Sequence, residues 1–291
     1  MFSKSIVALI TPFDALGCVD YKAFERLVFM QLEAGTSGLL ILGSTGEGLS
    51  LSLEEKQKLI QLAVKAVKGK VPIMVGASSA SATMCLEMLR LIKTHKADAA
   101  LVTPPFYVCP SQKGTLAYFK ELDKFGLPIV LYHHPGRTGV TLTLDTVQQI
   151  ASLKCVIGIK ESSGNEAFFY EVAKSVHAPL FVGDDAAMLS LSAYGAVGSI
   201  SVIANAFPKR WLSYVELCLA GKRDEAVNDQ ASFMPLFKAL SLESNPVGIK
   251  YVMHRLGLSE LYTRLPLLAP EEKNARALDE ALDMCSLHKL F

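Results

Sequence analysis

Lys160 ends a short apolar run, Val156 to Ile159, that has the character of a buried strand. If this strand lines the inside of a barrel, it carries an amine to the barrel mouth, partly shielded from water. Desolvation disfavours the ammonium form and lowers the pKa of lysine, giving the neutral amine that attacks a carbonyl carbon to form a Schiff base. The competing interpretation is a surface lysine, or one paired with Glu161. The position at a strand end favours imine chemistry.

Hydroxyl groups follow other apolar runs in the same way. Tyr132 ends the preceding run, and a phenol close to the amine can move protons while the carbinolamine forms and loses water. Ser44 and Thr45 stand between glycines, where hydroxyl and loop N–H groups can bind a carboxylate, and Tyr107 can extend a proton relay. Taken singly, each fits a core tyrosine or a residue that shapes a turn. Together they predict a site for a carbonyl compound that carries a carboxylate.

Charged and imidazole groups near the same strand ends allow further roles. Arg137 lies in a glycine-containing loop, where a guanidinium can hold a carboxylate through two hydrogen bonds. His133 and His134 suggest a metal site, but adjacent strand residues point to opposite faces and no partner pattern accompanies them. Asp184 and Asp185 are expected to cap the helix that follows them. The sequence therefore predicts an anion site and no metal.

Eight apolar runs alternate with helical patterns and can position these groups. The runs are Ser5 to Ile10, Gly38 to Leu42, Pro72 to Gly76, Ala99 to Thr103, Pro128 to Tyr132, Val156 to Lys160, Leu180 to Gly183 and Gly198 to Val202. Their starts lie 18 to 34 residues apart, close to the length of one strand plus a crossover helix. This pattern predicts an α/β protein with a closed (β/α)8 barrel, whose active site lies at the carboxyl ends of the strands.

Helical patterns fill the intervals and continue beyond the last strand. Ser52 and Glu55 form a capping box before one of them. The others are Tyr21 to Ala34, Ser81 to His95, Thr115 to Phe125, Leu144 to Ser152, Glu166 to Val176, Phe207 to Ala220, Arg223 to Leu242, Pro246 to Leu256 and Pro270 to Leu287. We expect a catalytic barrel at residues 1–221 and a helical extension at 222–291 that packs on it.

Composition and glycine loops exclude several classes of protein. The chain of 291 residues has 29 Lys plus Arg against 28 Asp plus Glu, so no basic field is available for nucleic acid or anionic lipid. Apolar runs break well short of the roughly 18 residues that a membrane span needs. The loop Gly43 to Gly48 has P-loop glycine spacing, but Leu49 replaces the required lysine, and no G-x-G-x-x-G follows the first strand. We expect no nucleotide cofactor.

The N-terminus and the cysteines indicate the compartment. No charged n-region with a long apolar stretch and a cleavage site begins the chain, so we expect no signal peptide and a cytoplasmic location. The 6 cysteines are too widely spaced for a disulfide framework or a zinc motif, and reduced, mostly buried thiols are expected.

Several of these motifs, in this order, resemble the class I, Schiff-base-forming pyruvate aldolases of the dihydrodipicolinate synthase and N-acetylneuraminate lyase superfamily. They are Gly43 to Gly48, Thr103 to Pro110, Tyr132 to Gly139, Gly158 to Gly164, Gly183 to Asp185 and Gly198 to Val202. The resemblance extends from Ile6 to about Leu268. It implies that Lys160 forms an imine with pyruvate, that Ser44 and Thr45 hold the pyruvate carboxylate, and that Tyr132 is the acid/base residue.

The resemblance also implies the remaining roles. Ser44 would link Tyr132 to Tyr107, which reaches into the site from a neighbouring subunit of a homotetramer. Gly183 and Ile200 would line the pyruvate pocket through backbone groups. Arg137 would bind the carboxylate of the second substrate, as in the synthase branch, which condenses pyruvate with L-aspartate-4-semialdehyde in diaminopimelate and lysine biosynthesis without cofactor or metal.

Departures from the family pattern keep alternatives open. Ser44 replaces a common Thr, His133-His134 replaces Asn and an aliphatic residue, Phe106 replaces a frequent Tyr, and Cys109 replaces a basic residue. One alternative is another pyruvate aldolase, acting on N-acetylneuraminate or a 2-keto-3-deoxy sugar acid. The other is a catalytically silent barrel, which would be expected to lose the lysine or the tyrosine.

The resemblance also bears on regulation. In feedback-inhibited relatives, polar groups at a subunit interface hold lysine, and here the corresponding residues are mostly apolar. They are Gly48, Leu49, Leu53, Lys56, Ala80, Met84 and Phe106. We expect no inhibition by lysine.

Overall fold

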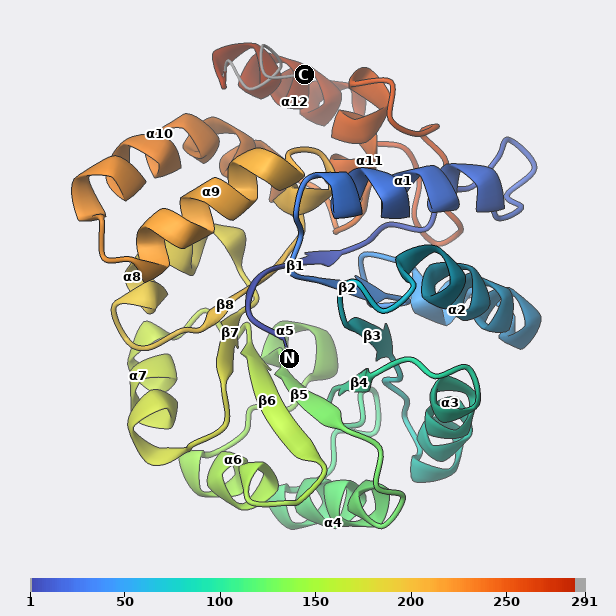
Figure 1. The fold of residues 1–291 in the computed structure, drawn as a ribbon, viewed down its shortest axis with the longest axis vertical. Coiled ribbons are helices and arrows are strands. Elements are labelled where there is room, and N and C mark those ends of the chain that lie inside the picture. Colours follow the sequence, from blue (N-terminus) through green and yellow to red (C-terminus); the bar gives the residue numbers. More distant parts are fainter. Residues whose placement is uncertain (1, 286–291) are drawn as a thin grey trace.

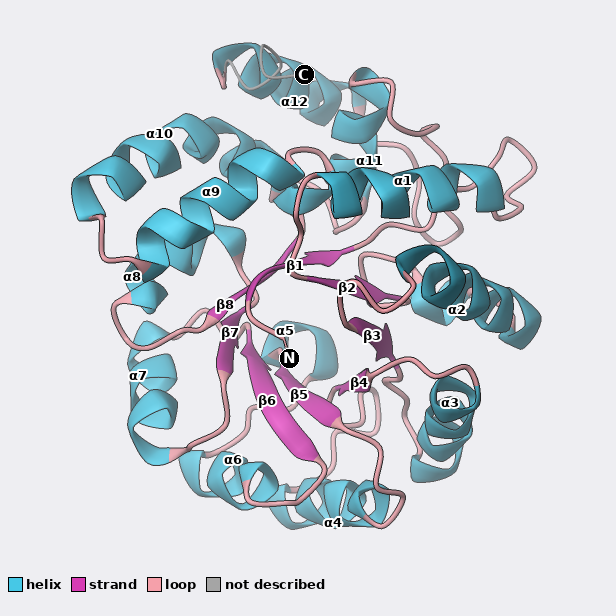
Figure 2. Ribbon diagram, in the orientation of Figure 1, coloured by secondary structure: helices cyan, strands magenta, loops and turns pink. Residues whose placement is uncertain are grey.

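The computed structural model describes residues 2–285 and contains the expected closed barrel of parallel strands in chain order (Figures 1 and 2). The strands are β1 (Lys4–Ala8), β2 (Gly38–Ile41), β3 (Ile73–Gly76), β4 (Ala99–Val102), β5 (Ile129–His133), β6 (Val156–Glu161), β7 (Leu180–Val182) and β8 (Gly198–Ser201). Their ends differ from the predicted ones by at most two residues. The β1 strand pairs with both β2 and β8, which closes the barrel.

Helices surround the barrel (Figure 2). They are α1 (Tyr21–Glu33), α2 (Leu53–Val67), α3 (Ala82–Thr94), α4 (Gln112–Asp123), α5 (Pro135–Thr138), α6 (Leu144–Ala151), α7 (Glu166–Ser175), α8 (Met188–Ser192), α9 (Pro208–Leu219), α10 (Arg223–Leu240), α11 (Val247–Arg255) and α12 (Glu272–Met284). The predicted capping box forms at Ser52 and Glu55. Helix α4 begins three residues before the predicted start because the Ser111 hydroxyl accepts a hydrogen bond from the Gly114 N–H.

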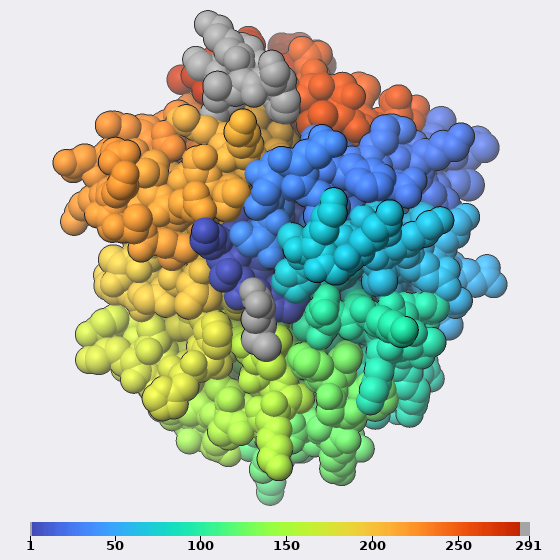
Figure 3. All heavy atoms as spheres, in the orientation of Figure 1, coloured from blue at the N-terminus to red at the C-terminus, as the bar shows by residue number. Residues whose placement is uncertain are grey.

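Two apolar layers hold the barrel. One fills its interior with side chains such as Ile6, Leu40, Met74 and Ile200. Tyr132, near the carboxyl end of β5, belongs to the same cluster. The other lies between the strands and the ring of helices. The N-terminal segment, dark blue in Figure 3, lies over the centre of the face shown. The interior is therefore a packed core, and chemistry is confined to the strand ends.

The C-terminal helices pack against the barrel helices. Helix α10 contacts α8 and α9, and α12 contacts α10 and α11 (Figure 1). Residues 286 and 287 of the last predicted helix lie outside the described residues. No helix within residues 2–285 is long and apolar enough to cross a membrane.

Candidate active site

The amine of Lys160 and the ring of Tyr132 lie next to each other at the ends of adjacent strands. The β5–β6 register pairs these two residues, and the Lys160 Nζ lies 4.4 Å from the centroid of the Tyr132 ring. Both side chains are buried, with Lys160 only 4% exposed. No carboxylate of the described residues forms an ion pair with this amine. A buried, unpaired amine beside a phenol has the arrangement that nucleophilic catalysis by lysine requires.

Glu161, the alternative partner of Lys160, is bound elsewhere. Because side chains alternate along a strand, Glu161 and His133 point away from the barrel interior. The Glu161 Oε2 lies 2.7 Å from the His133 Nδ1, and the Glu161 Oε1 accepts a hydrogen bond from the Ser163 N–H. The Leu142 N–H donates to the His133 Nε2, so Nδ1 carries the proton that His133 gives to the carboxylate. This buried pair joins β5 to β6 directly behind the site.

Gly183, the residue after β7, brings its backbone against the lysine. A Cβ atom at this position would lie 2.8 Å from the Lys160 Cε and would overlap the Ser162 hydroxyl. Any side chain would therefore displace the lysine or Ser162. The glycine expected to line the site is required by this close approach.

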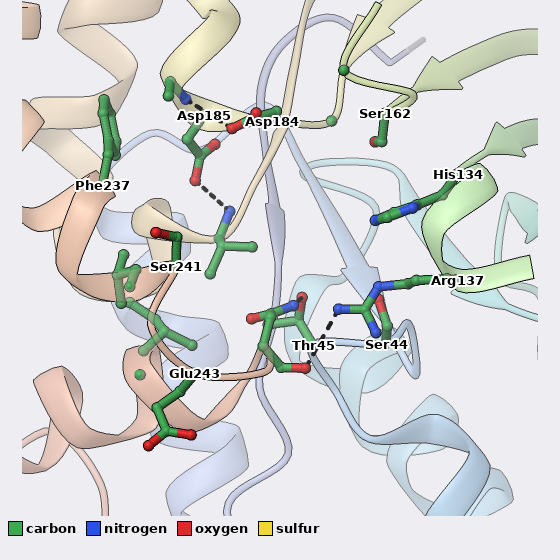
Figure 4. A pocket seen from close by; sticks show the side chains of 18 of the residues that line it. Ser44, Thr45, His134, Arg137, Ser162, Asp184, Asp185, Phe237, Ser241 and Glu243 are labelled. Carbon is green, nitrogen blue, oxygen red and sulfur yellow. Dashed lines mark hydrogen bonds between the residues drawn. The ribbon is translucent and has the colours of Figure 1, made fainter. Parts of the chain in front are cut away.

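Lys160 lines a cavity of about 600 Å³, and Figure 4 shows other side chains of its lining. Strand-end residues line one part of it, and the segment from α10 to α11 lines the rest. The strand-end group includes Ser44, Thr45, Tyr132, His134, Arg137, Lys160, Ser162, Gly183, Asp184, Asp185 and Val202, and the C-terminal group includes Phe237, Lys238, Ser241, Glu243 and Asn245. In Figure 4, His134 and Arg137 extend from the wall opposite Phe237 and Ser241.

Asn245 connects both predicted carboxylate-binding elements. Its side-chain amide donates to the Thr45 hydroxyl at 2.9 Å, and its backbone carbonyl accepts from the Arg137 guanidinium at 3.5 Å. The Ser44 side chain lines the cavity and makes no hydrogen bond to the described residues. Thr45 is therefore held in place, whereas the Ser44 hydroxyl is free for a ligand.

Glu47, at the far end of the same loop, forms a buried ion pair with Lys250 of α11. The Glu47 Oε1 lies 2.5 Å from the Lys250 Nζ, and the two side chains are 2% and 0% exposed. Lys250 also donates to the Tyr262 carbonyl, and the Arg264 N–H donates to the Glu47 Oε2. Burial lowers the pKa of Lys250 to about 8 in spite of the opposing effect of Glu47. The ion pair fixes the loop that carries Ser44 and Thr45 to the C-terminal helices.

Two of the predicted site residues lie apart from this cavity. Tyr107 is 91% exposed and has φ of 69°, a left-handed conformation that is strained for a tyrosine. Ile200 is fully buried in the barrel core, and Val202 is the residue after β8 that lines the cavity. A second cavity, about 200 Å³, is lined by Ser44, Tyr132 and Arg137 and extends to Phe106, the residue before Tyr107.

Of the two aspartates after β7, which were both expected to cap the next helix, only Asp184 does so. Asp184 caps the following 3₁₀ turn, since its carboxylate accepts from the Ala186 N–H. The expectation for Asp185 was wrong: its carboxylate accepts from the Val202 and Ile203 N–H groups, in the segment that follows the neighbouring strand β8. Burial raises the pKa of Asp185 to about 6, and these hydrogen bonds only partly oppose the shift. No cluster in residues 2–285 brings three His, Cys, Asp or Glu side chains together to hold a metal ion.

The sequence of residues 1–285 matches the dihydrodipicolinate synthetase family. This chain belongs to that family. A relative from Parvibaculum lavamentivorans, named 4-hydroxy-tetrahydrodipicolinate synthase, is 40% identical over 97% of this chain and 99% of its own.

Solved structures from the dihydrodipicolinate synthetase family have the same fold. The dihydrodipicolinate synthase from Aquifex aeolicus superposes with a TM-score of 0.95 at 34% identity, covering 98% of this chain and 99% of that one. An enzyme from Cyanidioschyzon merolae, described with lysine bound, gives a TM-score of 0.95 at 31% identity and covers 98% and 99% of the two chains.

Proposed function

We propose that this chain is a 4-hydroxy-tetrahydrodipicolinate synthase that condenses pyruvate with L-aspartate-4-semialdehyde through a Schiff base on Lys160. The observation that carries the proposal is the buried, unpaired amine beside Tyr132 at the base of a polar cavity. The family match and the names of the relatives support the synthase over the other pyruvate aldolases. We also propose that the enzyme acts in the cytoplasm.

The neutral amine of Lys160 attacks the keto carbon of pyruvate and gives a carbinolamine. Tyr132 donates the proton with which the hydroxyl group leaves as water, so that an imine forms. Tyr132, which has given up its proton, takes one from the methyl group and so turns the imine into an enamine. The enamine carbon attacks the aldehyde carbon of the second substrate, and Tyr132 returns the proton to the aldehyde oxygen. The amino group of that substrate then displaces Lys160 from the imine carbon.

The surrounding groups bind the two carboxylates. The free hydroxyl of Ser44 and the backbone around Thr45 hold the carboxylate of pyruvate close to Lys160. Arg137, whose guanidinium donates a hydrogen bond only to the Asn245 carbonyl among the described residues, holds the carboxylate of the aldehyde. This division puts the two reacting carbons between the lysine and the arginine.

Tyr107 acts in trans in this proposal. Its exposed, strained position fits a side chain that projects into a neighbouring copy of the chain. The second cavity, which extends from Tyr132 to Phe106, is the path along which a partner's tyrosine can approach Ser44 and Tyr132. The assembly is then at least a dimer, and by family resemblance a homotetramer. Light scattering at micromolar concentration tests this, because a fully active monomer would exclude the relay.

The decisive experiment is borohydride trapping. Incubation with pyruvate and borohydride should add a three-carbon adduct to Lys160, located by peptide mass spectrometry, and Lys160→Ala should abolish it. Lys238→Ala is the matched control, since Lys238 lines the same cavity and its loss should leave the adduct in place. Turnover is then compared for aspartate semialdehyde, N-acetylmannosamine and glyceraldehyde. An adduct that survives Lys160→Ala refutes the mechanism, and preference for a sugar aldehyde refutes the substrate assignment.

A further inference from the structure

His134 lies in the cavity wall with its hydrogen-bonding capacity unused. It is the residue before the short helix α5 and makes no capping hydrogen bond there. Its Nδ1 is buried without a partner among the described residues, and Nε2 bonds to no described residue either. Adjacent His133 is the opposite case, because both of its ring nitrogens are engaged. One histidine of the pair holds the strands together, and the other remains available to a ligand.

Its surroundings orient the ring toward the place where the second substrate reacts. The His134 ring packs edge-on against Tyr132, with centroids 5.7 Å apart and an interplanar angle of 77°. Gly136 lies beside the ring, since a Cβ there would be in ordinary van der Waals contact with the His134 Cε1. Figure 4 shows the side chains of His134 and Arg137 extending into the cavity from the same wall. A ligand bound to Arg137 therefore lies close to His134.

The ring is neutral at the pH of the cell. Burial lowers the pKa of His134 to about 4, and the nearby charges of Arg137 and Lys160 contribute to the shift. Either nitrogen of a neutral imidazole can carry the proton, and when Nδ1 carries it, Nε2 presents a lone pair that accepts a hydrogen bond from a cationic donor. An imidazolium would instead repel a cation. Burial, with the charge of Arg137 adding to its effect, thus keeps His134 an acceptor.

We propose that His134 determines specificity for the second substrate by accepting, at Nε2, a hydrogen bond from the α-ammonium group of an amino-acid aldehyde. Arg137 holds the carboxylate on the same carbon, so the two side chains together recognise the two charged groups of an α-amino acid. This inference rests on the proposed function, because it takes L-aspartate-4-semialdehyde as the aldehyde. It adds a reason why the cavity prefers this aldehyde to one without an amino group.

Two aldehydes that differ only in the amino group test the inference. Aspartate semialdehyde and succinic semialdehyde share the aldehyde, the chain length and the carboxylate. For the wild type, kcat/KM should favour aspartate semialdehyde, in part because succinic semialdehyde has no amino group to displace Lys160 and its adduct must leave when water hydrolyses the imine. The role of His134 is therefore measured by the change in kcat/KM for each aldehyde on substitution, not by the preference of the wild type. His134→Leu should lower kcat/KM for aspartate semialdehyde by about 10- to 100-fold, as loss of a hydrogen bond to a charged group does, and should leave succinic semialdehyde within about twofold. His134→Gln, which keeps an acceptor oxygen, should recover part of the preference.

Pyruvate trapping on Lys160 is measured in parallel and should be unchanged in both variants, which shows that the barrel and the imine site are intact. Equal losses for the two aldehydes would overturn the role of His134 and leave the synthase assignment standing. Absence of turnover of aspartate semialdehyde by the wild type would overturn the synthase assignment and this inference together. Loss of trapping in both variants would show that His134 supports the imine site and would also overturn the inference.

Discussion

Lys250→Met removes the cation from the most deeply buried ion pair described, and its effect follows from the contacts of Glu47. The variant leaves the Glu47 carboxylate, 2% exposed, with the Arg264 N–H as its remaining hydrogen-bond donor. Breaking a buried pair by removing one partner costs about 3–5 kcal/mol, because an uncompensated charge stays behind. Unfolding entropy of about 2.1 cal/mol/K per residue over 291 residues amounts to about 0.6 kcal/mol/K. The melting temperature should therefore fall by about 5–8 °C.

The double variant Lys250→Met, Glu47→Gln separates loss of charge balance from loss of packing. An amide at position 47 needs no counter-ion, so the double variant should melt between Lys250→Met and the wild type. Lys273→Met is the control, because its ion pair with Glu271 is exposed and its loss should leave the melting temperature unchanged. Melting is followed by circular dichroism at pH 7, where Lys250 still carries its charge, and at one protein concentration.

The same substitution should affect catalysis in a specific way. Because Glu47 fixes the loop of Ser44 and Thr45, Lys250→Met should raise the KM for pyruvate by about threefold to tenfold more than the KM for the aldehyde. An unchanged melting temperature in Lys250→Met would refute the energetic reasoning. A double variant that melts below the single variant would refute it as well. Equal changes in both KM values would show that the ion pair stabilises the fold without positioning the loop.

Three further predictions concern the cavity and the subunit surface. Arg137→Ala should raise the KM for aspartate semialdehyde about 10- to 100-fold and change that for pyruvate by less than about twofold in steady-state kinetics; equal effects would contradict its assignment. The folded-state pKa of His134, about 4 against 6.5, means that between these values the unfolded chain binds a proton that the folded chain does not. The free energy of unfolding should therefore fall between pH 7 and 4.5, and it should fall by about 1–2 kcal/mol more in the wild type than in His134→Gln. This figure is reduced to allow for solvent screening of the partly exposed ring, and urea denaturation at the two pH values measures it. L-lysine at millimolar concentration should neither inhibit nor release heat in calorimetry, because Leu49 and Met84 offer its charges no partner and Lys56 repels its ammonium groups; saturable binding with loss of activity would contradict this prediction.

The barrel and the adjacency of Lys160 and Tyr132 could be predicted because strands impose a simple geometry. Apolar runs of four to six residues at intervals of one helix identified every strand, and alternation along β5 and β6 separates inward from outward side chains. This alternation correctly assigned His133 and His134 to opposite faces. It could not predict which of them would be saturated, since the partner Glu161 lies 28 residues away and its proximity depends on the register of two strands.

The wall opposite the strands could not be predicted from any local pattern. Asn245 and Glu243 follow α10, a helix that the sequence identifies only as an extension, and the Asn245 contact to Thr45 spans 200 residues. The family resemblance implies a role for backbone groups at Ile200, and the residue after β8 that lines this cavity is Val202, one alternation further along. Long-range packing decides such positions, and a single sequence carries no periodicity that records it.

The contacts of the C-terminal helices also explain why the strand-end loops can be both polar and ordered. A loop such as Gly43 to Gly48 approaches the β2–β3 end so closely that a Cβ on Gly48 would overlap the Leu42 carbonyl. Such a loop has little apolar surface of its own to bury, so its position depends on partners elsewhere. Two residues of the helical extension are such partners: Lys250 forms an ion pair with Glu47, and Asn245 donates a hydrogen bond to Thr45. The extension therefore lines the cavity and holds its loops: without it, the barrel would retain Lys160 and Tyr132 but would lose the hydrogen bonds from Asn245 to Thr45 and from Arg137 to Asn245, which in the proposed function place these residues around a substrate.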